Sequence, residues 1–451
     1  MNHDQRRTLL LINPVSQLRT GFLMNRATKC QPLSLGIIAG LTPQEWKVKI
    51  IDENFRQFRY YEADLVGITS FTATATRAYE LAGIYRAKGI PVVMGGIHAT
   101  MVPDEAGQYC DSVVMGEAES IWQQVLEDFE SGSLKKQYRG TFTDLIHQPL
   151  PRRELFHPGY IAASIQTSRG CPMDCSFCSV SAFNGRHYRF RPINEVLDEL
   201  EQVSNNYVFF VDDNIVGHNT SARERAKELF TGIIERGIKK HWISQASLNF
   251  ADDEELLKLA ARSGCSMIFL GVETEGIEQL AEAGKKLNLH MVKDETYNQV
   301  FNRIRKHGIG VIGGFIFGFD HDTPQNLLNR ARFIRKSHVD SIQVSVLTPL
   351  PGTRLFEELR EAGRLTHTNL PADWERYDYY EPVFKLNNMS AETFDHYRSM
   401  AWNSIFSWPQ MVSRLFRTLL SNRNLKNTSI VWLNLYHYRR IFLLGWKRPY
   451  N

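Results

Sequence analysis

The feature that most constrains the fold is an alternation of short apolar runs with stretches of helical periodicity. The runs are rich in β-branched residues and each ends in a polar or glycine turn, as buried parallel strands do. Between these runs, residues 74–88 and 118–130 have apolar side chains at the spacing of a helix. Residues 1–140 are therefore predicted to form a Rossmann-like, doubly wound α/β domain that binds ligands at the carboxyl ends of its strands. The predicted strands span residues 8–12, 47–52, 65–70, 91–96 and 112–116.

A second alternation follows the polar, proline-bearing segment 141–160, which we interpret as a linker. Residues 161–370 contain six more apolar runs, separated by helical stretches. They predict a partial (β/α)6 TIM barrel, an architecture that places its chemistry on the loops after the strands. The alternation then fades, and residues 371–451 are predicted to form a small helical region. The six runs read IAASIQTS, YVFFVDD, WISQASL, MIFLGVE, GVIGGFIFG and SIQVSVLT.

Composition and cysteine usage narrow the class of protein. A chain that is 43% hydrophobic and 23% charged, without low-complexity tracts, is typical of a globular protein rather than a disordered one. The apolar run near the N-terminus is too short for a signal peptide or a membrane span, so we expect a cytoplasmic protein. Three of the six cysteines lie within eight residues, which indicates metal or redox chemistry rather than a disulfide framework.

Those three cysteines, Cys171, Cys175 and Cys178, follow the first predicted barrel strand in a single CxxxCxxC loop. Three thiolates from one loop are able to ligate three irons of a [4Fe–4S] cluster and leave the fourth iron open to a small molecule. The alternatives are three incidental cysteines or a structural zinc loop completed by His187, although structural zinc sites use four ligands.

The run SRGCPMDCSFC resembles the signature of the radical S-adenosylmethionine (SAM) superfamily, and Phe177 matches its aromatic position. The resemblance implies that SAM chelates the open iron. It also implies that an external donor of the flavodoxin or ferredoxin type reduces the cluster, and that SAM is cleaved to a 5′-deoxyadenosyl radical.

The resemblance extends to later strand ends and implies further SAM contacts. Asp212, Asp213 and Asn214 would bind the methionine amino group, unless they are simply helix caps. Glu273 would bind the ribose, unless it is an ordinary loop residue. The adenine-packing GxIxGxxE motif is matched by Gly314, Ile316 and Gly318, but His321 stands in place of its final acid.

An α/β domain ahead of such a barrel resembles the cobalamin-binding class of radical SAM enzymes, which includes C-methylases, hopanoid methylases and the anaerobic cyclase of chlorophyll synthesis. The segments that carry this resemblance are PLSLGIIAGLTP followed by DEN, ITSFTAT, GGIHATMVPDEA and GEAES. The DxHxxG motif of a lower-axial histidine is absent, so we expect cobalamin without that ligand. Its predicted contacts are Thr69, Ser70, Thr72, Gly95, Gly96, Gly116 and Glu117.

The leading interpretation is a cobalamin-dependent methyltransferase that acts on an unactivated carbon of an apolar small molecule or lipid. A runner-up keeps both cofactors but cyclises, hydroxylates or rearranges its substrate. An alternative of another class is a non-catalytic iron–sulfur sensor or electron carrier.

The C-terminal end of the chain differs from the rest in charge. Residues 401–451 contain eight Lys or Arg and no Asp or Glu, together with four of the eight tryptophans. Such basic, aromatic helices are able to lie on anionic membranes. Peripheral membrane contact is one expectation, packing of these helices on the barrel is the other, and nucleic acid is not expected.

Overall fold

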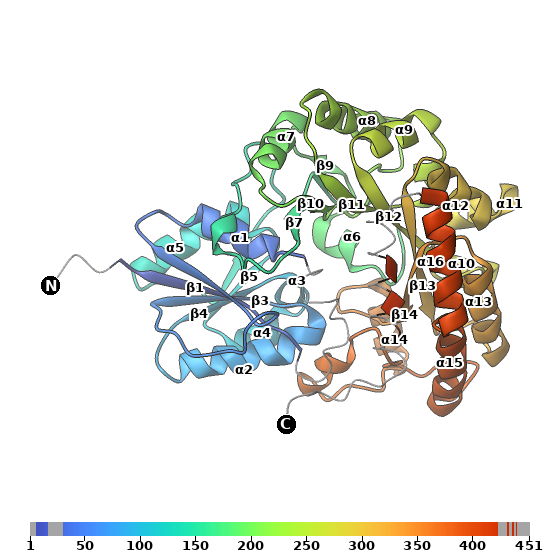
Figure 1. The fold of residues 1–451 in the computed structure, drawn as a ribbon. Coiled ribbons are helices and arrows are strands. Elements are labelled where there is room, and N and C mark those ends of the chain that lie inside the picture. The colour runs from blue at the N-terminus through green and yellow to red at the C-terminus, as the bar shows by residue number, and fades with distance from the viewer. Residues whose placement is uncertain (1–5, 17–29, 423–430, 433–434, 437–438, 440–451) are drawn as a thin grey trace.

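The computed structural model describes residues 6–16, 30–422, 431–432, 435–436 and 439 (Figure 1). Two six-stranded parallel sheets organise this part of the chain. Within it, no helix is long and apolar enough to cross a membrane.

The first sheet has the strand order β2-β1-β3-β4-β5-β6, and all its pairs are parallel. This order reverses between β1 and β3, which is where doubly wound sheets bind their ligands. The sixth strand was not predicted, because three residues with one buried side chain carry little periodicity. The strands are β1 (Thr8–Asn13), β2 (Lys47–Asp52), β3 (Leu65–Thr69), β4 (Val92–Gly95), β5 (Ser112–Met115) and β6 (Gln137–Arg139).

Helices cover both faces of this sheet, and an apolar cluster fills the space on each side. Both faces of the sheet are apolar because the side chains of the central strands are buried on each side, as Leu65, Val66 and Ile68 of β3 show. The helices are α1 (Leu33–Leu41), α2 (Ala75–Arg86), α3 (Ile97–Met101), α4 (Pro103–Tyr109) and α5 (Trp122–Glu130).

The second sheet has the order β14-β13-β12-β11-β10-β7, so consecutive strands are neighbours around an open, partial barrel. The predicted α/β fold, with a Rossmann-like domain followed by a (β/α)6 barrel, is confirmed. A short antiparallel hairpin of β8 (Ser168–Arg169) and β9 (Arg189–Phe190) was not predicted. The barrel strands are β7 (Ala162–Ile165), β10 (Tyr207–Phe210), β11 (His241–Ala246), β12 (Cys265–Glu273), β13 (Gly310–Phe317) and β14 (Ser341–Val346).

Helices pack outside the barrel strands and bury amphipathic faces against them, as the fully buried Leu256, Leu257 and Ala260 of α9 illustrate. These helices are α7 (Ile193–Gln202), α8 (Thr220–Glu235), α9 (Glu254–Arg262), α10 (Ile277–Glu282), α11 (Lys286–Asp294), α12 (Tyr297–Lys306), α13 (Pro324–Lys336) and α14 (Arg354–Glu361). The short helix α6 (Ser179–Asn184) lies instead in the segment between β8 and β9 and has no buried residue.

The chain after the barrel contacts both halves of the molecule. Trp374 is buried in the core of the first domain, where its indole N–H donates to Glu105 at 2.7 Å. Helices α15 (Ala391–Ile405) and α16 (Trp408–Asn422) lie instead on the barrel, against α13 and α12 (Figure 1). The C-terminal region therefore bridges the first domain and the barrel.

Candidate functional site

The loop that carries the three clustered cysteines is closed at its neck by the β8–β9 hairpin, in which Arg169 pairs with Arg189. Inside the loop, the N–H of Cys171 donates to the carbonyl of Gly185 at 3.2 Å. Gly170 has a φ of +94°, and a Cβ there would lie 2.1 Å from the carbonyl oxygen of His187. The glycine before the first cysteine is therefore required by the turn.

The far side of the loop is tethered to the barrel. The N–H of Ser176 donates to the carbonyl of Ala283 at 3.1 Å, between α10 and α11. Asp174 accepts from Arg354 at the start of α14, at 2.8 Å. The cysteine loop is therefore held by three separate elements before any cofactor binds.

The donor set fits an iron–sulfur cluster. The three thiols are partly buried and lie close enough to interact electrostatically, and burial raises the pKa of Cys178 to about 12. Among the residues that the structure describes, no three His, Cys, Asp or Glu side chains converge on a single metal ion. A cubane does not need such convergence, because each cysteine binds a different iron.

Glu273 ends β12 in a conformation that ordinary residues avoid. Its φ is +63°, and the register of β12 against β13 shifts between Gly271 and Glu273. A bulge of this kind re-aims the side chain, and such strain is typical of functional sites. A Cβ on Gly271 would lie 2.5 Å from the carboxylate of Glu273, so the glycine makes room for the acid.

Lys285 was missed by the sequence analysis because a lone lysine in a helix-rich stretch carries no motif. Its ammonium lies 2.6 Å from Glu273 and interacts electrostatically with Cys175 and Cys178. Burial alone would lower the pKa of Lys285, but Glu273 and the thiols raise it overall, so the lysine is charged. It supplies a positive charge between the predicted cluster and the predicted ribose site.

The three polar residues after β10 have different surroundings. Asp212 is fully buried and accepts from the backbone and hydroxyl of Thr167 and from Ser168, so its carboxylate holds the strand before the cysteine loop. This differs from the predicted role in SAM binding. Asp213 accepts from Asn184 at 3.1 Å, and burial raises its pKa to about 6.

One buried polar atom next to the cysteine loop, the side-chain oxygen of Asn214, lacks a hydrogen-bond partner. The buried hydroxyl of Tyr188 lies beside it and interacts with Cys171, Asp213 and Asn214. A buried polar group without a partner costs free energy unless a ligand or water satisfies it. The side-chain oxygen of Asn214 thus has unused hydrogen-bonding capacity, which fits a polar ligand such as SAM.

The strand predicted to pack on adenine is arranged around aromatic rings. A Cβ on Gly314 would lie 2.5 Å from the ring of Phe269, and Gly318 has a φ of +95°. Ile316 shares a small apolar cluster with Phe177 of the cysteine loop. These predicted residues therefore border the cysteine loop, while their contacts with SAM stay predictions.

The acid missing from the adenine motif stands one residue further on. Asp322 is fully buried, accepts from the N–H groups of Gly318 and Phe319, and forms a bidentate pair with Arg330 at 2.7 and 2.8 Å. Arg330 also donates to Thr274, after β12. Asp322 therefore ties the ends of β12 and β13 together, whereas His321 pairs with Glu282 at the surface.

Replacing Asp322 with asparagine is expected to destabilise the protein by about 3 kcal/mol, because the fully buried Arg330 would lose its bidentate partner and keep only the 3.3 Å ion pair with Glu275. Chemical denaturation monitored by circular dichroism measures this. The control is Glu357→Gln, which removes the partner of Arg360 from a pair whose two side chains are both exposed, and it should cost less than about 1 kcal/mol. Equal losses in both variants would contradict this account of Asp322.

The predicted cobalamin contacts of the first domain lie where the sheet order reverses. Thr69 ends β3, and the buried hydroxyl of Ser70 has no hydrogen-bond partner. A Cβ on Gly96 would lie 2.7 Å from the Thr69 hydroxyl, so this glycine packs the β3 and β4 loops together. Gly95 ends β4 beside them. The unused Ser70 hydroxyl fits a polar ligand at this edge; residues 17–29 lie outside the described residues.

Three predicted contacts have other partners here. Thr72 lies 3.4 Å from the buried His98, whose pKa is lowered by burial, so the imidazole is neutral. Gly116 has a φ of +75° and packs against Gly140. Glu117 is buried in ion pairs with arginines of the β8–β9 hairpin, so its carboxylate is turned to the barrel.

Comparison with known proteins places this geometry in a family. A family model described as "Radical SAM superfamily" matches residues 165–334, and one described as "B12 binding domain" matches residues 19–126. The bacteriochlorophyllide d C-12(1)-methyltransferase of Chlorobaculum tepidum is 32% identical over 86% of this chain and 84% of its own length. The chain belongs to the cobalamin-binding class of radical SAM enzymes.

Two further likenesses agree with this assignment. The anaerobic magnesium-protoporphyrin IX monomethyl ester cyclase of Cereibacter sphaeroides is 27% identical over 73% of this chain and 57% of its own length. The solved structure of the cobalamin-dependent SAM radical enzyme OxsB covers 97% of this chain and 72% of that chain, with a TM-score of 0.66 at 15% identity. The family assignment confirms the prediction of a radical SAM enzyme. It also confirms, at the level of the family, the predicted cofactors: the iron–sulfur cluster, SAM and cobalamin.

Proposed function

We propose that this enzyme is a cobalamin-dependent C-methyltransferase whose substrate is an apolar tetrapyrrole or lipid. The observation that carries the proposal is the direct contact between the predicted cobalamin edge and the cysteine loop, through Glu117 and the arginines at the neck of that loop. The residues predicted to bind the two cofactors are therefore linked to each other within one chain. The methyltransferase relative acts on a bacteriochlorophyllide, which favours this substrate class.

When bound, the cluster with SAM supplies a hydrogen-abstracting radical, and cobalamin supplies a methyl carrier. The protein's own residues hold and orient these groups. The cysteine loop fixes the cluster, Lys285 and Glu273 provide adjacent opposite charges for a zwitterionic ligand, and Ser70 offers a hydroxyl on the facing domain. An external electron donor of the flavodoxin or ferredoxin type is part of the proposal.

The test is an anaerobic incubation of the reconstituted enzyme with a bacteriochlorophyllide, a reducing system and SAM deuterated in its methyl group. A product heavier by one deuterated methyl group supports the proposal. A cyclised or hydroxylated product without the label would instead support the runner-up, which the cyclase relative favours.

We also propose that α16 contacts an anionic membrane. The face of this helix toward the barrel is unusually polar: Arg414 and Thr418 are buried, and Thr418 donates to Asp340 at 2.7 Å. Apolar side chains of the helix face outward at a spacing of four residues. These are Trp408, Val412, Phe416 and Leu420, which are 46%, 40%, 60% and 78% exposed. The eight cationic and no acidic residues of 401–451 complement anionic lipids.

Liposome flotation tests this contact. We expect binding to vesicles with phosphatidylglycerol but not to neutral phosphatidylcholine vesicles, and a loss of about tenfold or more in the variant F416E/L420E. Ile146→Glu is the control, because Ile146 is also exposed, at 55%, but lies in the linker. Wild-type binding unaffected by F416E/L420E would contradict the proposal. A change in oligomeric mass in that variant would indicate that the face contacts a second copy instead.

A further inference from the structure

The neck of the cysteine loop is the place where the barrel contacts the first domain. Arg169 stands two residues before Cys171, and Arg189 lies opposite Arg169 in the β8–β9 ladder. These two arginines therefore flank the segment 170–188, which contains all three cysteines. Both side chains form ion pairs with the same partner, Glu117.

Glu117 follows β5 directly, at the carboxyl edge of the first sheet. Arg189 donates to its two carboxylate oxygens at 2.5 and 2.9 Å, and Arg169 lies 3.3 Å away. The N–H and hydroxyl of Thr143 in the linker also donate to it, at 2.9 and 3.1 Å. Burial alone would raise the pKa of Glu117, but the arginines lower it, so the acid is ionised. Glu117 thus joins the first domain, the linker and the neck at one carboxylate.

The backbone on either side of Glu117 packs closely against Gly140 of the linker boundary. Gly116 has a φ of +75°, and a Cβ there would lie 2.8 Å from the carbonyl oxygen of Gly140. A Cβ on Gly140 would in turn lie 2.0 Å from the carbonyl oxygen of Glu117. The GEAES segment is therefore built to present its acids to the barrel. Its second acid, Glu119, binds Arg169 at 2.5 Å.

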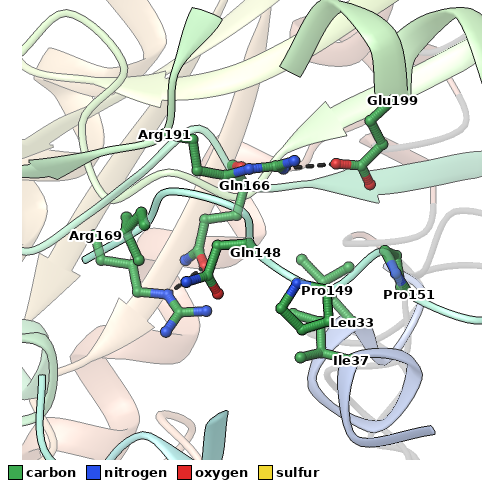
Figure 2. A pocket seen from close by; sticks show the side chains of 10 residues that line it. Leu33, Ile37, Gln148, Pro149, Pro151, Gln166, Arg169, Arg191 and Glu199 are labelled. Carbon is green, nitrogen blue, oxygen red and sulfur yellow. Dashed lines mark hydrogen bonds and ion pairs between the residues drawn. The ribbon is translucent and has the colours of Figure 1, made fainter. Parts of the chain in front are cut away.

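A second set of polar side chains, next to the neck, also lies between the first domain, the linker and the barrel. Figure 2 shows a small cavity bordered by α1, the linker and the barrel, with Arg169 and Arg191 on its polar side. Arg191 pairs with Glu199 at 2.6 Å, and Arg169 donates to Gln166 at 2.8 Å. The buried Nε of Arg191 and a buried side-chain oxygen of Gln148 have no partner. The cavity is able to hold a bridging water between them.

Buried ion pairs of this kind add little net stability compared with apolar contacts, but they specify geometry. We propose that Glu117 is a positioning residue that fixes the cysteine loop against the cobalamin-binding edge and so couples the two cofactors. The consequence for catalysis rests on the proposed function, whereas the mechanical role does not. Reactions between groups held on two domains are sensitive to their separation, and a displacement of about 1 Å is able to cost about a hundredfold in rate.

The experiment compares Glu117→Gln with the wild type in the reconstituted holoenzyme. Glu119→Gln is the milder variant, because it removes only the ion pair of Glu119 with Arg169. The control is Glu295→Gln, which removes a bidentate partner of Arg303 at 2.5 and 2.8 Å within the barrel. Hydrogen exchange of residues 170–188 is the first readout and does not depend on activity. We expect exchange at least about tenfold faster in Glu117→Gln, a smaller increase in Glu119→Gln and no change in Glu295→Gln.

The second readout is the ratio of two products of SAM. S-adenosylhomocysteine forms when SAM gives up its methyl group toward the first domain. 5′-Deoxyadenosine forms when an electron cleaves SAM into methionine and a 5′-deoxyadenosyl radical, and this radical takes a hydrogen atom from the substrate. In Glu117→Gln we expect methyl transfer to fall by about tenfold or more while 5′-deoxyadenosine formation changes by less than about threefold.

A parallel fall of both products would overturn the inference, because it would show a general structural effect and no specific coupling of the cofactors. Unchanged exchange in the loop would also overturn it, because it would show that Glu117 does not hold the cysteine loop in place. If the wild type forms no S-adenosylhomocysteine, the proposed function fails. The exchange comparison then still decides the mechanical role of Glu117.

Discussion

Replacing Cys175 with alanine is expected to remove the iron–sulfur cluster and to lower SAM cleavage at least about a thousandfold, below detection. Three thiolates are the minimum that holds the cubane while leaving one iron open, and the loop contains no fourth cysteine. The structure holds the loop independently of the cluster, through Ser176 with Ala283 and Asp174 with Arg354. The variant should therefore fold without binding iron.

Iron content, visible absorbance and 5′-deoxyadenosine measure this effect in anaerobically reconstituted protein. Cys265→Ala is the matched control, because Cys265 is buried at the start of β12 and packs in the barrel core. It should keep a full cluster and its activity. A Cys175→Ala variant with a full cluster and normal SAM cleavage would show that the open-iron account of this loop is wrong.

The second large effect is expected at Lys285. Replacing it with methionine leaves the buried carboxylate of Glu273 without its partner at 2.6 Å and removes a positive charge from the vicinity of Cys175. We expect SAM to bind about thirtyfold more weakly, which is about 2 kcal/mol, because the variant loses the positive charge that holds the Glu273 carboxylate beside the cysteine loop.

Equilibrium dialysis with SAM, on reconstituted enzyme in the oxidised state, measures this loss apart from turnover. Lys286→Met is the control, because it removes a neighbouring lysine that forms no ion pair in the described structure. The double variant E273Q/K285M should bind SAM only slightly worse than either single variant, since both act through one pair. Additive losses would contradict the coupling.

The main features of the fold were predictable because both sheets are parallel and buried on both faces. Such strands appear in the sequence as continuous apolar runs, and the runs before Thr69, Gly95 and Glu273 show this most clearly. Strand β6 and the β8–β9 hairpin were not predictable, because two or three residues show no periodicity. The hairpin is nevertheless what gives the cysteine loop its neck.

The candidate site was predictable where its chemistry is local in sequence. The spacing of Cys171, Cys175 and Cys178 alone indicated a cluster, since the ligands share one loop. Arg189 pairs with Glu117, which is 72 residues away in the chain. Lys285 and Arg330 lie nearer to Glu273 and Asp322 in sequence, but each pair joins a strand end to a following helix segment, and no spacing rule connects them. The motif GEAES was recognised but assigned to cobalamin, because sequence does not show which way an acid after a strand is turned.

The central claim is that one chain unites SAM cleavage with cobalamin-dependent methyl transfer. The most direct measurement is anaerobic reconstitution with and without cobalamin, followed by the absorbance spectrum and quantification of 5′-deoxyadenosine and S-adenosylhomocysteine. We predict a bound corrin, and both products only when cobalamin is present together with substrate. A chain that takes up no corrin, or that forms 5′-deoxyadenosine but no S-adenosylhomocysteine in the presence of cobalamin and substrate, would contradict the claim.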